Sequence, residues 1–261
     1  MSTVTLAMRD SSTMVRRQLK RLLRYPSMTV QLVVTPVIIL LLFVYVLGGT
    51  LGTGLGGGRA TYVNYVVPGI LLMAAATAAT GTAVMVATDM TEGIIARFRT
   101  MRISRASVLT GHVVGSVIQQ LLGMAVLIGI ALAIGFRPDA NAAEWLAAAG
   151  MLTLFAVAIT WLSVALGLKS PTPEAASNAP MPLILLPFLG SGFVPTDSMP
   201  TALRWFAEYQ PFTPIMQTVR GLLLGTPIGD DAAIAVAWCA GIAAASYLWA
   251  KHTFNNQGSK A

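Results

Sequence analysis

Long runs of apolar residues restrict the possible folds of this chain more than any other feature. Several of these runs exceed the roughly 18 residues that a helix needs to cross a lipid bilayer. None alternates apolar and polar residues as the strand of a membrane barrel would. Hydrophobic residues make up 55% of the chain and charged residues only 10%, a balance typical of polytopic membrane proteins. The sequence therefore predicts an all-α membrane protein.

Six membrane spans are predicted, at residues 30–47, 65–88, 111–136, 145–168, 179–193 and 232–250. The fifth is short, and prolines 180, 182 and 187 interrupt it. Pro68 falls in the first turn of the second span, where the missing N–H of proline is harmless. The chain is thereby divided into an N-terminal segment (1–29), a six-span domain (30–250) and a short tail (251–261).

The distribution of basic residues predicts the orientation of the spans. If both termini lie on one side, that side carries thirteen of the 17 Lys and Arg residues. Because basic residues concentrate in cytoplasmic loops, we expect both termini to be cytoplasmic. The net charge of +7 is then a topology signal, and no nucleic-acid partner is expected.

An amphipathic helix is predicted before the first span. Met8, Val15, Leu19 and Leu22 recur at helical spacing on one face, and basic residues occupy the other face. This pattern is typical of a helix that lies in the lipid headgroup layer. Pro26 ends the helix before the first span.

The loop between the second and third spans, residues 89–105, is unusually rich in charge. Each charge would cost roughly 2.5–3.5 kcal/mol at the bilayer centre, so the loop lies in water or against another protein. Ile94, Phe98 and Met101 form an apolar stripe at helical spacing, bordered by arginines. A short helix of this kind fits a groove on a partner protein. A solvated basic loop is the alternative interpretation.

Polar residues inside the spans are few, and they are uncharged. No Asp, Glu, Lys or Arg lies well inside a predicted span, so an intramembrane ion relay is not expected. The uncharged polar residues either form hydrogen bonds between helices or line a substrate path. They are Gln119, Gln120, Thr160, Ser163 and Asn178. His112 is interpreted as an interfacial or packed histidine.

The chain contains only weak matches to nucleotide-binding, metal-binding and catalytic motifs. The stretch 52–57 fits a dinucleotide-binding pattern by letter, but no strand precedes it, so it is interpreted as a flexible loop. The stretch 167–170 lacks the adjacent Gly and Lys of a Walker A motif. Cys239 is the single cysteine, and no metal-site spacing is present. A serine hydrolase built from Ser191 and His112 is disfavoured, because the two residues are predicted on opposite sides of the membrane. No catalytic or metal site is therefore expected in this chain.

The segment after the fifth span is too long for a simple turn. Residues 194–226 contain four prolines, yet two apolar helical runs occur at 202–209 and 215–224. We expect two short helices on the outer side that dip back into the membrane, where protein must cover any backbone that is not helical.

Motifs in the charged loop and in the outer segment carry a resemblance to a known family. They are Glu92-Gly93-Ile94-Ile95, Arg97-Phe98-Arg99, Val108-Leu109, Gly192-Phe193-Val194-Pro195, Met199-Pro200, Gln210-Pro211-Phe212-Thr213-Pro214 and Arg220. Through them, and over essentially its whole length, the chain resembles the membrane subunits of type-2 ABC exporters, specifically the daunorubicin-resistance-permease group.

The resemblance implies a division of labour between subunits. The charged loop would be a coupling helix that docks on a separate ATP-binding subunit, through Glu92, Gly93, Ile94, Ile95, Arg97, Phe98, Arg99 and Met101. The outer re-entrant helices would include Phe193, Pro195, Pro211, Phe212, Thr213, Pro214 and Arg220. Two ATP-binding subunits would hold ATP and Mg, and this chain would need no cofactor.

The function implied by the resemblance is export. The chain would pair with a second permease, identical or related, in the plasma membrane. The pair would move a hydrophobic or amphipathic substrate, of the drug, lipid or glycolipid class, out of the cytoplasm or the inner leaflet. An ATP-independent channel or small-solute carrier is the alternative from another functional class.

Overall fold

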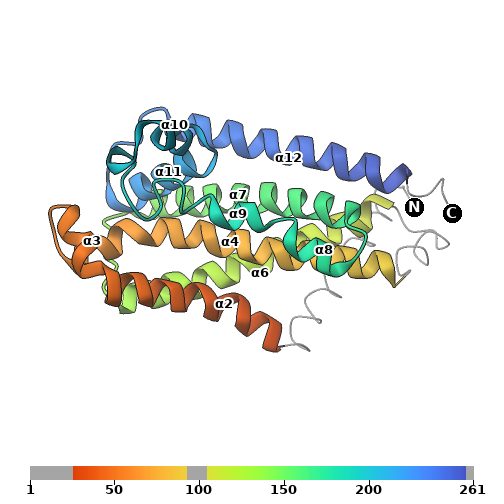
Figure 1. Ribbon diagram of the computed structural model, residues 1–261, viewed down its shortest axis with the longest axis horizontal. Helices are drawn as coiled ribbons and strands as arrows, with labels where there is room; N and C mark the ends of the chain where they lie inside the picture. The colour runs from red at the N-terminus through yellow and green to blue at the C-terminus, as the bar shows by residue number, and fades with distance from the viewer. Residues whose placement is uncertain (1–25, 93–104, 257–261) are drawn as a thin grey trace.

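The computed structural model describes residues 26–92 and 105–256 (Figure 1). The described residues form a bundle of helices, and none of them lies in a β-strand. The predicted N-terminal amphipathic helix and most of the predicted coupling helix lie outside the described residues. The overall all-α prediction is confirmed.

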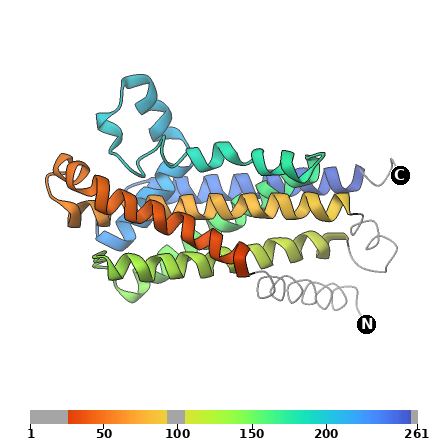
Figure 2. The same ribbon diagram turned by 60° about the horizontal axis from the view of Figure 1, so that its bottom comes forward.

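Five helices are long and apolar enough to cross a membrane, among the described residues. They run side by side along the long axis of the molecule (Figures 1 and 2). The first is formed by α2 (Pro26–Leu41), which continues through the π-helical turn η1 (Leu42–Leu47) into α3 (Gly48–Gly54). The others are α4 (Arg59–Thr91), α6 (Arg105–Ala133), α7 (Ala142–Lys169) and α12 (Asp231–Asn256).

Helix α4 lies at the centre of the bundle. It contacts α2, α6, α7, α8 and α11, and apolar side chains are buried along most of its length. A helix that is apolar all round belongs in a core. Small residues let α7 approach it closely: a Cβ on Gly167 would lie 2.5 Å from the carbonyl oxygen of Ala83. Close backbone approach at small residues is how helices pack within a membrane.

The first two helices extend beyond their predicted ends. The first was expected to end at Gly48, but the chain stays helical to Gly54, so only part of the predicted glycine-rich loop is non-helical. Gly48 and Gly52 are buried against the start of α4, so packing outweighs the weak helix propensity of glycine. Helix α4 begins at Arg59, which places Pro68 inside the helix and not in its first turn.

The predicted fifth span is not one continuous helix. It consists of α8 (Pro173–Asn178), α9 (Met181–Leu185) and turns that reach Val194. The passage still follows α4 for much of its length. Ala176 packs with Ala83 and Ala87 towards one end of α4, and Gly192 lies against Gly69 towards the other. The interruption by prolines was predicted, and it gives a broken helical passage beside five continuous ones.

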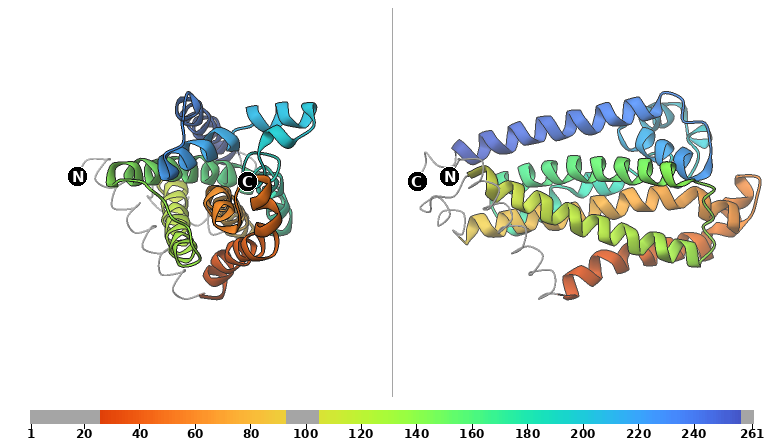
Figure 3. Two further views of the ribbon diagram at one scale, coloured as in Figure 1. Left: turned by 90° about the vertical axis from the view of Figure 1, so that its left-hand side faces the viewer. Right: turned by 180° about the vertical axis from the view of Figure 1, so that it is seen from behind.

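Two short helices gather with α3 at one end of the bundle, which we call the α11 end (Figure 3, right). They are α10 (Thr201–Tyr209) and α11 (Phe212–Leu224), which follow the 3-10 turn η2 (Thr196–Ser198). Both helices were predicted, at 202–209 and 215–224. In the structure each begins slightly earlier than predicted. Pro200 and Pro211 directly precede them, where proline favours helix initiation. The opposite end, where α4 stops and α6 starts, is called the loop end.

Candidate functional site

The loop end presents the connection that the sequence identified as a docking element. Helix α4 ends at Thr91, and Glu92 is exposed just beyond it, its N–H bonded to the carbonyl oxygen of Thr88. Helix α6 begins at Arg105. Among the predicted coupling residues only Glu92 is described. The others lie outside the described residues: Gly93, Ile94, Ile95, Arg97, Phe98, Arg99 and Met101.

A buried polar pair joins the two helices that flank this connection. Nε2 of His112 on α6 lies 3.2 Å from Oδ2 of Asp89 on α4, and both side chains are buried. A carboxylate enters an apolar interior only when a partner compensates its lost hydration. The prediction that Asp89 lies in the loop is wrong, because α4 continues past it to Thr91. The available signal was its position three residues after Val86, which is buried on the same helix.

Four helices pack together around this pair. Val86 of α4, Val113 of α6, Leu168 of α7 and Phe254 of α12 belong to one buried apolar cluster. Because cores are close-packed, a displacement of one of these helices is transmitted to its neighbours. The loop between α4 and α6 is thus attached to a rigid frame.

The polar residues of the bundle interior do not gather at one place. Gln120 donates from Nε2 to Oγ1 of Thr160 over 2.8 Å, and both are buried, so the interhelical hydrogen bond considered above is present. Ser163 is buried on α7, and its Oγ has no hydrogen-bond partner within the described chain. Gln119 is half-buried and Asn178 is exposed at the end of α8. Their role in a substrate path stays a prediction.

At the α11 end, side chains bind the carbonyl groups of the broken passage. Gln210 donates to the carbonyl oxygen of Leu186 (3.1 Å), and the Tyr62 hydroxyl donates to that of Phe193 (3.2 Å). The carbonyl oxygen of Ser191 accepts from the Tyr65 hydroxyl at 2.9 Å. Backbone outside a helix must be satisfied by protein when it lies within a membrane. These bonds make the irregular passage compatible with that position.

Arg220 of α11 is the centre of this network. Its Nη2 donates to the carbonyl oxygens of Ser191 (2.8 Å) and Tyr65 (3.1 Å), and its guanidinium carbon lies 4.0 Å from the centroid of the Tyr65 ring. Burial lowers the pKa of Arg220, and the neighbouring Tyr65 opposes that shift. An arginine stays charged in either case. We call Tyr65, Ser191 and Arg220 the Arg220 cluster.

The other predicted outer residues surround this cluster. Phe193 stacks on Phe188 with ring centroids 4.3 Å apart, and Oγ1 of Thr213 accepts from the N–H of Ser191 at 3.3 Å. Phe212 and Pro214 are buried on α11, whereas Pro195 and Pro211 are partly exposed. Tyr62 and Tyr65 were not among the predicted site residues, because their spacing in the sequence gives no sign of a partner more than a hundred residues away.

Ser191 and His112 lie at opposite ends of the bundle. Ser191 belongs to the Arg220 cluster at the α11 end, and His112 pairs with Asp89 at the loop end. A serine nucleophile needs its base within hydrogen-bonding reach. The two residues therefore do not form a hydrolase site together, as the sequence analysis expected.

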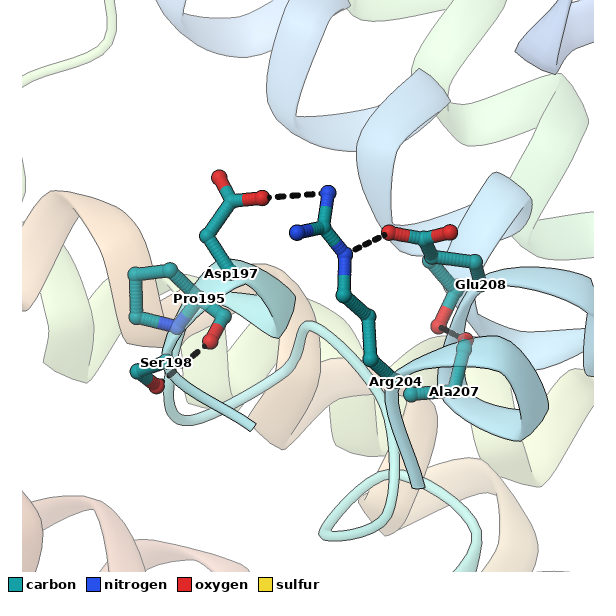
Figure 4. A network of polar contacts seen from close by, with 7 residues as sticks. Pro195, Asp197, Ser198, Arg204, Ala207 and Glu208 are labelled. Atoms are coloured by element: carbon teal, nitrogen blue, oxygen red, sulfur yellow. Dashed lines mark hydrogen bonds and ion pairs between the residues drawn. The ribbon is translucent and has the colours of Figure 1, made fainter. Parts of the chain in front are cut away.

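An exposed ion-pair network connects η2 with α10 (Figure 4). Arg204 contacts Asp197 through Nη2 and Glu208 through Nε, each over 2.7 Å. Exposed ion pairs contribute little to stability. Helix α10 also exposes Trp205 and Tyr209, aromatic residues of the kind that collect at membrane–water interfaces.

The chain is similar in sequence to known proteins. The sequence profile of the family described as ABC-2 type transporter matches residues 10–224. The daunorubicin resistance ABC transporter permease protein DrrB1 of Streptomyces coeruleorubidus is 27% identical over 222 residues, which are 84% of this chain and 77% of that protein. The probable doxorubicin resistance ABC transporter permease protein DrrC, from two strains of Mycobacterium tuberculosis, is 25% identical over 177 residues. That match spans 68% of this chain and 64% of DrrC.

Proposed function

The chain belongs to the ABC-2 type transporter family, whose members are membrane permeases, and from this premise we propose that it exports a hydrophobic or amphipathic molecule. A separate ATP-binding subunit supplies the energy. Two such subunits hold ATP and Mg, and a second permease chain, identical or related, completes the complex. The complex lies in the plasma membrane with both termini of this chain in the cytoplasm.

The observation that carries the proposal is the frame at the loop end. The connection from Glu92 to Arg105 joins two helices that the Asp89–His112 pair ties together. The apolar cluster extends this frame to α7 and α12. A subunit that docks on this connection therefore acts on four helices at once.

The docking residues are those of the apolar stripe and its basic border. Phe98 inserts into a groove of the ATP-binding subunit, and Arg97 and Arg99 bind acidic groups at its rim, as amphipathic helices commonly dock. Glu92 and Gly93 begin the coupling helix, which also contains Ile94, Ile95 and Met101. Closure of the ATP-binding subunits moves this helix and rocks the frame, and the amphipathic segment within residues 1–29 rests on the inner membrane surface.

The α11 end forms the exit side. Helices α10 and α11 dip into the outer membrane surface, where Trp205 and Tyr209 meet the headgroups. Carbonyl groups of the broken passage accept hydrogen bonds from side chains of the protein. These groups therefore need no partner from lipid or water. On the path between the two ends the cargo meets Gln119, Gln120, Thr160, Ser163 and Asn178.

The cargo class follows from the relatives. The names of DrrB1 and DrrC refer to resistance to daunorubicin and doxorubicin. We assign this chain a substrate of the same general kind, an amphipathic drug, lipid or glycolipid.

The partner is tested by purifying the chain from its native membrane in mild detergent and identifying what accompanies it by mass spectrometry. The proposal predicts an ABC-type ATP-binding subunit, which is lost when Phe98 and Arg99 are both replaced by alanine. The matched control is Arg204→Ala, which also removes a surface arginine but lies on α10. Recovery of the chain alone, or only with further copies of itself, would contradict the proposal and favour an ATP-independent channel or carrier.

A further inference from the structure

A pocket of about 520 Å³ opens at the α11 end. It lies between the turn after α3, the start of α4, the segment after α6 and the end of α11. Figure 3 (left) looks towards this end of the bundle. The residues that line it include Leu55, Ala60, Asn64, Arg137, Arg220 and Leu224.

Two arginines give the pocket a positive charge. Arg137 and Arg220 both line it, and none of the described residues that line it is acidic. Neither arginine forms an ion pair with a carboxylate within the described chain. Two uncompensated guanidinium groups in one concave site attract an anionic group.

Both guanidinium groups line the pocket. Arg220 is buried, with 9% of its surface exposed, and its Nε is covered by protein and has no hydrogen-bond partner in the described part of the chain. Arg137 donates through Nη1 to the carbonyl oxygens of Leu132 (2.6 Å) and Phe136 (2.9 Å). No bond from its Nη2 or Nε to another described residue is formed, so these exposed donors can bind an anionic acceptor.

The pocket is built by fixed backbone. The N–H of Arg137 donates to Oδ1 of Asn64 over 3.0 Å, which ties the segment after α6 to α4. Gly135 turns this segment with φ = 112°, a conformation that a side chain would oppose, and Phe136 is fully buried beside it. Arg137 therefore stands at a defined place on the pocket rim although its side chain is exposed.

The length of α4 bears on the depth of the pocket in the membrane. Its 33 residues span about 50 Å at about 1.5 Å per residue. The hydrocarbon core of a bilayer is only about 30 Å thick, and the headgroup layers add roughly 5–8 Å on each side. A hydrocarbon core centred on α4 would leave about 10 Å of the helix beyond it at each end. Ala60 and Asn64 lie in the first two turns of α4, within that length. Leu55, Ala60 and Leu224 supply an apolar wall beside the two arginines.

We propose that this pocket binds the phosphate group of an anionic phospholipid from the membrane leaflet that surrounds the α11 end. The part of the Arg220 side chain that lines the pocket and the free donors of Arg137 bind the phosphate oxygens, as arginine commonly does. The apolar wall contacts the glycerol backbone and the upper acyl chains. This inference goes beyond the proposed export function and does not depend on the direction of transport.

The test measures lipid binding to the full-length purified chain in detergent by native mass spectrometry. Phosphatidylglycerol is titrated against the wild type and Arg137→Gln, with phosphatidylcholine as the zwitterionic comparison. Arg137 is exposed, so its substitution leaves the buried Arg220 cluster intact. We expect one tightly held phosphatidylglycerol, and about a tenfold loss of affinity in Arg137→Gln from the missing charge-assisted bonds. Arg204→Gln is the matched control, because it removes an exposed arginine of the same end outside the pocket, and it should retain wild-type affinity.

Three results would overturn the proposal. The first is equal affinity of Arg137→Gln and the wild type for phosphatidylglycerol. The second is an equal loss of affinity in Arg204→Gln, which would indicate attraction by net charge alone. The third is displacement of phosphatidylglycerol by an equimolar amount of inorganic phosphate, which would identify a site for a free anion without a lipid contact.

Discussion

Asp89 on α4 and His112 on α6 lie 3.2 Å apart, from Oδ2 to Nε2, on the two helices that flank residues 93–104. Both side chains are buried within the packed frame of the loop end. A polar pair in this position fixes the two helices relative to each other. Force applied to the connection between them is thereby carried into the bundle.

Replacing His112 with alanine should weaken this link. The substitution removes one partner of a buried carboxylate, which costs about 1–3 kcal/mol of stability. We expect a lower thermal unfolding midpoint and a greater loss of transport than of membrane insertion. Lys251→Ala, which removes an exposed side chain on α12, is the control and should change stability by less than about 0.5 kcal/mol. Equal effects of the two substitutions would contradict a special role for His112.

Two glycines of α4 provide a matched pair for the packing of the broken passage. A Cβ at Gly69 would lie 2.6 Å from the carbonyl oxygen of Gly192, whereas a Cβ at Gly81 would meet nothing within 4 Å. Gly69→Ala should therefore destabilise the protein by about 1–3 kcal/mol, as overpacking does. Gly81→Ala should stabilise it by roughly 0.5–1 kcal/mol through helix propensity. Thermal unfolding in detergent measures both, and a harmless Gly69→Ala would mean that Gly192 is not held against α4.

Arg220 should tolerate neither removal nor exchange for lysine. Arg220→Met removes the donors that bind the carbonyl oxygens of Tyr65 and Ser191. The expected cost is on the order of 2–3 kcal/mol, because hydrogen bonds to charged groups are among the stronger ones. Arg220→Lys keeps the charge but loses the planar contact with Tyr65, so it should fall between methionine and the wild type. If Arg220→Lys were as stable as the wild type, the positive charge alone would account for the contribution of Arg220 to stability.

The Gln120–Thr160 hydrogen bond can be separated from a role in the substrate path. A double-mutant cycle with Gln120→Leu and Thr160→Val should give a coupling energy of about 0.6 kcal/mol, and at most about 1.7 kcal/mol, in thermal unfolding. A zero coupling energy would contradict the structural role. If the pair also lines the path, the single variants will change the ratio of transport rates for two different cargoes.

Much of the fold could be predicted because membrane insertion acts directly on composition. Long apolar runs identify spanning helices without any knowledge of their neighbours, and the shorter apolar runs at 202–209 and 215–224 identify α10 and α11. The ends of the helices were less predictable. Gly48 and Gly52 remain helical because they pack against the start of α4, and that contact joins parts of the chain that a local pattern does not relate.

The polar connections of the candidate site could not be predicted for the same reason. Tyr65, Ser191 and Arg220 meet from three separate parts of the chain, and the atoms involved are mostly backbone carbonyl groups. Every residue has a backbone carbonyl group, so the sequence does not show which of these groups accepts a hydrogen bond from a side chain. Asp89 was assigned to the loop because an ionisable residue beside an apolar run normally marks its end. Its burial next to His112 depends on the neighbouring helix, which the local pattern around Asp89 does not reveal.

We propose that the connection between α4 and α6 couples ATP hydrolysis to export. This is tested by measuring ATP-dependent efflux of daunorubicin, the compound in the name of DrrB1, from vesicles that contain the purified complex. We expect efflux that requires ATP and is lost when Phe98 and Arg99 are both replaced by alanine, with the chain still inserted in the membrane. Efflux that continues without ATP, or that the double substitution leaves unchanged, would contradict it.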